Sequence, residues 1–236
     1  MSKIIHRAES RGVADHGWLY SRHTFSFASY YDPDRMGFGK LRVVNDDLVK
    51  GGAGFGAHPH DNMEIVSVPL AGALRHRDSM GNTHVIRAGE VQIMSAGTGL
   101  THSEYNDSAT EAVNFLQIWV LPKERDIEPR YGQKAFDQAE HHNRFLTVVA
   151  PERGDETVWI NQDAWLSLGN LDAGRTLSYT ANRAGHGLYL FVIEGQIEVA
   201  DETLGTRDAI GITDAAELAV GAGLDSWLLM IEVPMT

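Results

Sequence analysis

Two pairs of candidate metal ligands occur far apart in the sequence. His58 and His60 lie in the stretch AHPHDNMEIV, and His102 and Glu104 lie in the stretch THSEY. Because successive side chains of a strand point to opposite faces, the two members of each pair share a face, about 6.6 Å apart. If the two strands lie side by side, about 4.8 Å apart, all four side chains converge on one point in a barrel. The sequence therefore predicts a metal site built from three imidazoles and one carboxylate.

This donor set suits ferrous iron, manganese, cobalt, nickel, copper or zinc, and it leaves open positions on an ion that takes five or six ligands. Glu64 is the competing carboxylate, since it has the same parity as His58 and His60. A straight strand would place Glu64 about 13 Å from His60, so it could reach the ion only through a bend or bulge. We favour Glu104 as the ligand and place Glu64 behind the ligands or in the cavity wall. The reverse assignment, with Glu64 as the ligand, stays open.

The other histidines and the aromatic residues give weaker signals. His141 and His142 are adjacent, so their side chains diverge, and we expect a solvated pair. Phe55 is the aromatic residue nearest before the first histidine pair and is our candidate for substrate contact. Six histidines have no second histidine at ligand spacing and are expected to be structural or exposed: His6, His16, His23, His76, His84 and His186. Four aromatic residues are expected in the core: Phe25, Phe27, Tyr30 and Tyr31.

Composition excludes several classes of ligand and binding partner. The 236 residues include 32 acidic and 20 basic side chains, a net charge of −12, which disfavours direct binding to nucleic acid or to an anionic membrane. The absence of cysteine excludes thiolate ligands, disulfides and cysteine nucleophiles. The N-terminal stretch MSKIIHRAESRG has no apolar run of signal-peptide length, so we expect a cytoplasmic protein.

Short β-rich runs separated by turn residues predict an all-β fold of the barrel or jelly-roll kind. In the first half the expected strands are Leu41–Val44, Glu64–Pro69, Ala73–Arg77, Thr83–Arg87, Val91–Met94 and Asn114–Leu121. In the second half they are Phe145–Val149, Trp159–Ile160, Trp165–Leu168, Leu188–Ile193, Gln196–Ala200 and Trp227–Val233. We expect one barrel over residues 1–125, a charged linker over 126–144 with a short helix near Lys134–His141, and a second barrel over 145–236.

The second barrel is expected to hold no metal. Both halves contain a strand, glycine, strand pattern, around Gly72 and Gly195. When these glycines are superposed, the positions of the first histidine pair become Ala181 and Arg183, and no histidine follows His186. We therefore expect one metal ion per chain.

Three segments carry a resemblance to a known family: HGWLYSRHTFSFASYYDP, FGAHPHDNMEIVSVPLAG and IMSAGTGLTHSEYN. They closely resemble signatures of the pirin family of bicupins, and within it the bacterial pirin-like proteins described as quercetin 2,3-dioxygenases. The resemblance is strong over most of residues 1–125 and thinner beyond. It implies two face-to-face cupin barrels, with the metal in the first.

The ligand pattern of the family falls on His58, His60, His102 and Glu104. In many other cupins the glutamate after the His-x-His pair is a ligand, so the place given to Glu64 rests on the pirin likeness and the strand geometry together. The family also leads us to expect Fe(II) and a monomer.

The resemblance implies a dioxygenase that opens the ring of a flavonol such as quercetin. In that reaction the ion would bind the deprotonated 3-hydroxyl as a Lewis acid, and Glu104 would act as catalytic base. The alternative is a non-enzymatic regulator in which the redox state of iron changes the binding of a transcription factor or enzyme partner. A dioxygenase or isomerase for another metabolite would use the same residues.

Overall fold

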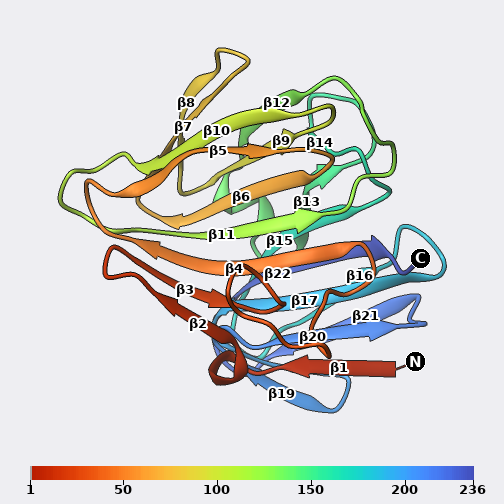
Figure 1. Ribbon diagram of the computed structural model, residues 1–236. Helices are drawn as coiled ribbons and strands as arrows, with labels where there is room; N and C mark the ends of the chain where they lie inside the picture. Colours follow the sequence, from red (N-terminus) through yellow and green to blue (C-terminus); the bar gives the residue numbers. More distant parts are fainter. Residues whose placement is uncertain (1) are drawn as a thin grey trace.

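Short strands with alternating burial make up most of the chain. The computed structural model describes residues 2–236, and its strands form two β-barrels that stack on one another (Figure 1). Each barrel combines a seven-stranded sheet with a four-stranded sheet, and almost every strand pair is antiparallel. The fold is therefore the all-β bicupin architecture expected from the sequence. In the described residues no helix is long and apolar enough to cross a membrane.

The first barrel has the sheet orders β12-β9-β6-β11-β4-β3-β2 and β5-β10-β7-β8. Its strands are β2 (Gly12–Asp15), β3 (Leu19–His23), β4 (Leu41–Val49), β5 (Gly54–His60), β6 (Glu64–Ala71), β7 (Ala73–Asp78), β8 (Thr83–Arg87), β9 (Glu90–Ser95), β10 (Leu100–Asn106), β11 (Val113–Val120) and β12 (Arg130–Ala135).

The second barrel has the sheet orders β1-β20-β17-β22-β15-β13-β14 and β16-β21-β18-β19. Its strands are β1 (Ser2–His6), β13 (Phe145–Ala150), β14 (Val158–Trp159), β15 (Trp165–Leu171), β16 (Thr176–Thr180), β17 (His186–Glu194), β18 (Gln196–Val199), β19 (Glu202–Gly205), β20 (Ala209–Thr213), β21 (Glu217–Ala222) and β22 (Ser226–Pro234).

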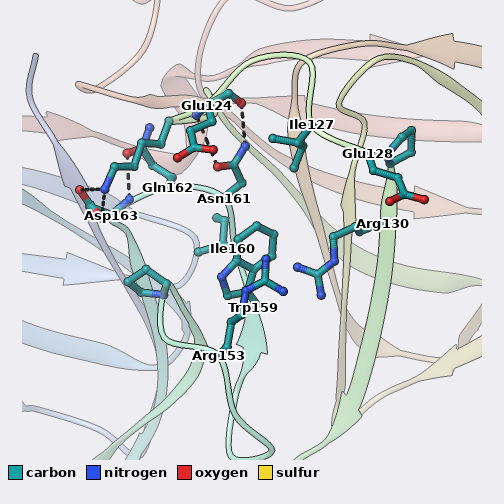
Figure 2. A pocket seen from close by; sticks show the side chains of 13 residues that line it. Glu124, Ile127, Glu128, Arg130, Arg153, Trp159, Ile160, Asn161, Gln162 and Asp163 are labelled. Atoms are coloured by element: carbon teal, nitrogen blue, oxygen red, sulfur yellow. Dashed lines mark hydrogen bonds and ion pairs between the residues drawn. The ribbon is translucent and has the colours of Figure 1, made fainter.

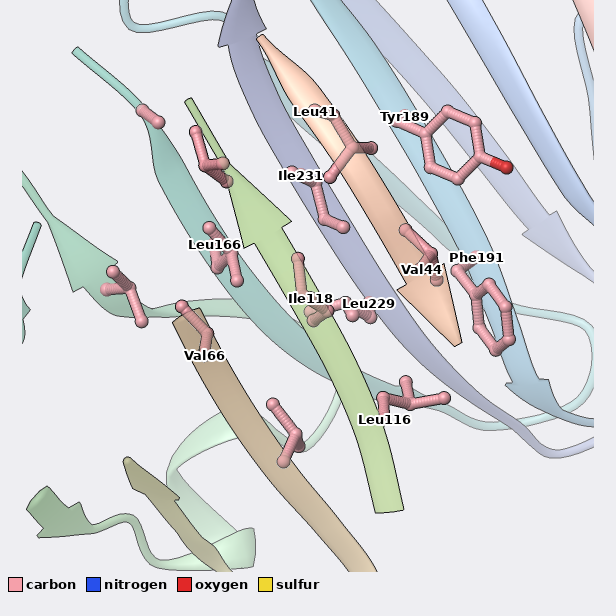
Figure 3. Close-up of a cluster of buried hydrophobic side chains, with 14 of the residues drawn as sticks. Leu41, Val44, Val66, Leu116, Ile118, Leu166, Tyr189, Phe191, Leu229 and Ile231 are labelled. Atoms are coloured by element: carbon pink, nitrogen blue, oxygen red, sulfur yellow. The ribbon is translucent and has the colours of Figure 1, made fainter. Parts of the chain in front are cut away.

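The largest apolar cluster lies between the barrels, where the two seven-stranded sheets pack face to face (Figure 3). Leu116 and Ile118 of β11 enter it from the first barrel, and Leu229 and Ile231 of β22 enter it from the second. All four side chains are fully buried. Because strand side chains alternate between faces, the odd-numbered neighbours in β11 point the other way, into the first barrel.

The interiors of the two barrels differ in chemistry. The second is filled by a continuous apolar cluster that includes Leu190, Val220 and Met230. The first has only two small apolar clusters, around Phe115 and around Met94. Much of the remaining interior is polar, so the first barrel has the environment in which ligands and titratable groups can gather.

Two segments depart from the expected boundaries. Ser2–His6 pairs with β20 and so lies in the sheet of the second barrel. Residues 130–135 are not linker but strand β12, which pairs with β9 of the first barrel. The short helix expected near Lys134–His141 is confined to the one-turn 3₁₀ helix η2 (Gln138–His141), because Lys134 and Ala135 belong to β12; a second 3₁₀ helix, η1 (Ala8–Ser10), follows β1. The sequence RYGQKA over 130–135 has no alternation of apolar and polar residues that would mark a strand.

Truncation of a leucine in the shared cluster should destabilise the protein far more than truncation of a leucine outside it. We expect Leu116→Ala to lower the free energy of unfolding by about 2–5 kcal/mol, since it leaves a cavity between the sheets. Leu48→Ala, on an exposed position of β4, is the matched control and should change it by less than about 0.5 kcal/mol. Urea unfolding followed by tryptophan fluorescence measures both. Equal losses would show that the interface is not a tightly packed core.

Candidate metal centre

Strands β5 and β10 bring the two predicted ligand pairs together. They pair antiparallel, with His102 directly opposite His58 and Leu100 opposite His60. A β-bulge between His102 and Glu104 shifts the register, so that Glu104 lies opposite Phe55. Because directly opposed residues have Cβ atoms about 4.5–5.5 Å apart, the imidazoles of the two strands meet on the inner face.

The three imidazoles form a tight cluster. Their ring centroids are 4.5 Å apart for His58 and His102, 4.8 Å for His58 and His60, and 4.9 Å for His60 and His102. One ring nitrogen of each lies within 4.8 Å of the others, and the Nε2 atoms of His58 and His102 are 3.1 Å apart. This is the spacing of donors that share one cation.

The protonation of the histidine rings also favours a shared cation. Burial, with the charges of neighbouring histidines, lowers the pKa of His102 to about 2 and that of His60 to about 4, so both rings are neutral at pH 7. Nδ1 of His58 lies 2.7 Å from the carbonyl oxygen of Gly56, which can only accept, so Nδ1 carries the proton. In the neutral ring of His58 the lone pair is therefore on Nε2, the atom that faces His102. Facing ring nitrogens of this kind fit a cation between them.

Glu104 lies next to the cluster, buried on β10. Its carboxylate oxygens accept hydrogen bonds from Ser67 Oγ at 3.2 Å and from Gln117 Nε2 at 2.8 Å. Burial raises the pKa of Glu104 to about 7, although both hydrogen bonds favour the charged form. One of its oxygens lies within 4.8 Å of ring nitrogens of His102 and His76. Glu104 is thus held where it can bind a cation or exchange a proton near pH 7.

A small cavity of about 70 Å³ opens beside these residues. Its polar wall includes His58, His60 and Glu104, and its apolar wall includes Phe55 and Trp119. The remaining wall residues come mainly from β3, β4 and β11: Leu19, Ser21, His23, Phe27, Asn45, Asp47 and Gln117. The rings of Phe27 and Trp119 meet edge to face at 5.2 Å, and Trp119 meets His60 in the same way at 5.0 Å. The cavity joins an aromatic wall to the histidine cluster.

Asp47 is a second buried carboxyl group in this wall. It accepts a hydrogen bond from Ser21 Oγ. Burial raises its pKa to about 7, and the nearby carboxylates of Asp46 and Glu104 add to the effect. Asp47 is therefore largely protonated below neutral pH.

Glu64 does not join the cluster. The turn between β5 and β6 includes Asn62 at a φ of 45°, and the parity of β5 does not continue through it. Glu64 shares its face of β6 with Val66, toward the second barrel, where it accepts hydrogen bonds from Ser95 Oγ at 2.7 Å and from the Asn161 backbone N–H at 3.1 Å. The placement of Glu64 behind the ligands or in the cavity wall therefore disagrees with the structure.

Several aromatic residues and histidines differ in position from what the sequence led us to expect. Phe27 lines the cavity rather than the core, and Tyr31 is 73% exposed, whereas Phe25 is buried in the inter-barrel core as expected. His76 is fully buried opposite Glu104, with its ring 5.4 Å from that of His102. His141 is buried rather than solvated. For His76, the sequence did contain a signal: a polar residue stands at a position of its strand where the alternation points side chains into the barrel.

The architecture and the histidine cluster define a bicupin with a candidate site for a divalent metal. Comparison with known proteins gives the family. The Pirin family model matches residues 5–120, and the model described as "Quercetinase C-terminal cupin domain" matches residues 147–233. The chain belongs to the pirin family.

Full-length relatives support this assignment. The chain is 41% identical to a quercetin 2,3-dioxygenase of Escherichia coli over 98% of both chains. It is 44% identical to a putative quercetin 2,3-dioxygenase of Pseudomonas aeruginosa over 94% of this chain and 95% of the other. A crystal structure of the bacterial pirin YhhW from Escherichia coli in complex with nickel(II) superposes over 100% of both chains with a TM-score of 0.94 and 40% identity. The expected likeness to bacterial pirins named as quercetin 2,3-dioxygenases is confirmed.

Removal of any one histidine of the cluster should abolish tight metal binding. We expect the wild-type protein to bind one divalent ion per chain. His58→Ala, His60→Ala and His102→Ala should each weaken binding by more than about 100-fold, since even residues behind the ligands are worth 10–100-fold. His84→Ala, an exposed histidine on β8, should bind as the wild type does. Elemental analysis and calorimetric titration of metal-free protein measure both quantities. Two tight equivalents per chain would contradict the assignment.

The same titration tests the two glutamates. Glu104→Gln should weaken metal binding, because it removes the carboxylate beside His102, whereas Glu64→Gln should leave it within about threefold of the wild type, because Glu64 faces the other barrel. Loss of binding in Glu64→Gln with retention in Glu104→Gln would reverse the two roles.

Asp47 should make the stability of the metal-free protein depend on pH. Its pKa is 3.8 when unfolded and about 7 when folded, so the folded state binds more protons between these values and stability falls as the pH rises through that window. Asp47→Asn keeps the acceptor for Ser21 and removes the titration. Relative to the wild type, the variant should gain up to roughly 4 kcal/mol of unfolding free energy between about pH 4 and about pH 7. Urea unfolding across this range would refute the prediction if the difference stayed constant.

Proposed function

We propose that the protein is a metal-dependent dioxygenase that opens the ring of a flavonol such as quercetin, with Fe(II) as its metal. The observation that carries the proposal is the cluster of three imidazoles, with Glu104 beside it, next to a cavity whose other side is aromatic. The full-length relatives named as quercetin 2,3-dioxygenases supply the substrate class.

A bound divalent metal would supply Lewis acidity toward the flavonol hydroxyl and a route for reaction with dioxygen. His58, His60 and His102 would hold it through their ring nitrogens. The Nδ1–H of His58 donates to Gly56 and so fixes the orientation of that ring. These residues bind and orient, and the proton chemistry falls to the carboxyl groups.

Glu104 is suited to accept the proton of the flavonol 3-hydroxyl. A general base works best when its pKa lies near the working pH, and burial brings the pKa of Glu104 to about 7. The hydrogen bonds from Ser67 and Gln117 fix its carboxylate on the cavity side of β10. Loss of this proton turns the flavonol into the electron-rich anion that dioxygen oxidises, and the ring opens to a depside with release of carbon monoxide.

The cavity limits how a flavonol can bind. Pockets for drug-sized ligands usually measure about 300–1,000 Å³. At about 70 Å³, this cavity admits only the hydroxyl-bearing edge of a flavonol. The remaining rings would lie against Phe27 and Phe55, which are half-buried at the cavity wall and can exclude water from the reacting edge.

Oxygen consumption with quercetin tests the proposal. Protein loaded with Fe(II) should consume dioxygen and release carbon monoxide when quercetin is added. Glu104→Gln should lower kcat by at least about 100-fold, the usual contribution of a general base. Glu217→Gln, an exposed carboxylate on β21, is the matched control and should keep full activity.

The proposal is wrong if metal-replete protein consumes no dioxygen with quercetin while a known quercetinase reacts in the same assay. Partner binding that changes between ferrous and ferric protein would then favour the regulatory alternative.

A further inference from the structure

A broad groove of about 680 Å³ lies along the seam between the barrels, away from the histidine cluster (Figure 2). One wall is the segment 123–130 that follows β11, and the other comes from residues 151–163 of the second barrel. Backbone and side-chain hydrogen bonds close the seam at one end, where the Lys123 N–H donates to the Asn161 carbonyl at 2.7 Å and Asn161 Nδ2 donates to the Glu124 carbonyl at 2.7 Å. The groove is therefore part of the folded assembly of the two barrels.

Two arginines occupy the other end. The guanidinium carbon of Arg130 lies 4.2 Å from the centroid of the Trp159 ring, and that of Arg153 lies 4.3 Å from the same centroid. Figure 2 shows both guanidinium groups gathered at this ring, although they come from different barrels. Cation–π contact holds them near the indole and leaves their N–H groups available to a ligand.

The positive charge at this end is only partly balanced. Within residues 2–236, neither Arg130 nor Arg153 forms an ion pair, and Nη1 of Arg130 is buried without a hydrogen-bond partner. Burial, followed by repulsion from Arg153, lowers the pKa of Arg130 from its usual value, although the nearby buried carboxyl group of Glu64 acts in the opposite direction without forming an ion pair with it. Two like charges held together in this way are destabilising unless an anion joins them.

Acidic groups also line the groove, but they leave this end open. Asp163 pairs with Lys123 at 2.9 Å. Glu124 lies by Asn161 at the opposite end in Figure 2, and Glu128 is exposed and forms no ion pair with either arginine. A protein with a net charge of −12 that gathers two unpaired arginines at one ring has a local positive site on an acidic surface.

We propose that Arg130 and Arg153 form a binding site for the oxyanion group, phosphate or carboxylate, of a small molecule in the groove between the barrels. Guanidinium forks match the geometry of both groups and bind them through paired N–H···O bonds. The site is separate from the histidine cluster and does not depend on the activity proposed for it.

Parallel titrations of the full chain with inorganic phosphate and with succinate test the site. The ionic strength is kept constant, and chloride serves as the control for nonspecific screening of charge. The readout is the NMR shift of the arginine Nε–H and tryptophan indole N–H resonances, assigned from Arg130→Gln and Arg153→Gln. We expect saturable shifts at both arginines and at Trp159. Saturation by phosphate alone identifies a phosphoryl ligand, and saturation by succinate alone identifies a carboxylate.

The variants locate the site. Arg153→Gln should weaken binding of the saturating anion by about tenfold or more, as expected for the loss of hydrogen bonds to a charged group. Arg175→Gln, an exposed arginine in the second barrel that makes the same change in net charge, should bind like the wild type. Arg153 is exposed, so its variant should fold and bind metal normally. The absence of saturable shifts with either anion, or equal affinity in Arg153→Gln and Arg175→Gln, would overturn the proposal.

Discussion

The seven-stranded sheet of the first barrel is buried on both faces, and the rest of the structure depends on how its strands divide their side chains between them. In β11, Leu116 and Ile118 enter the core between the barrels, whereas Gln117 and Trp119 face the candidate metal site. A one-residue slip would exchange these sets, placing an amide in the apolar interface and a leucine against Glu104. The apolar packing on one face therefore fixes the register of the polar site on the other.

The second barrel supports the first through this interface. Its interior is filled by apolar side chains, and its buried Glu232 accepts hydrogen bonds from the Tyr179 hydroxyl and from the backbone N–H groups of Asn182 and Arg183. A carboxylate satisfied in this way is structural. Without the second barrel, the outer face of the first would expose its apolar residues to water, and the strands that position the ligands would lose the packing that orients them.

Much of this architecture could be predicted from sequence, because alternation within one strand is a local property. The two ligand pairs needed only parity and the assumption that their strands are neighbours, which the pairing of β5 with β10 satisfies. The errors arose where the outcome depends on the path of the chain between elements. Glu64 is an even-numbered residue like the histidines, but the turn at Asn62 changes the face of the sheet on which the following even-numbered side chains lie. His76 carries no partner at ligand spacing, and only the pairing of β7 with β10 brings it opposite Glu104. The pairing of β1 with β20, which places the N-terminal strand in the second barrel, is not indicated by any local feature of the sequence.

The polar interior of the first barrel also explains how the site can exist before any ion binds. Burial moves several groups toward their neutral forms, lowering the pKa of His60 and His102 and raising that of Glu104 and Asp47. The cluster therefore avoids most of the free energy that buried charges would cost. Small apolar clusters around Phe115 and Met94 hold the barrel on either side of it. The same low-dielectric surroundings strengthen the attraction between these donors and a cation. In this barrel, the interior that permits folding with neutral ligands is also the one that favours a divalent ion once present.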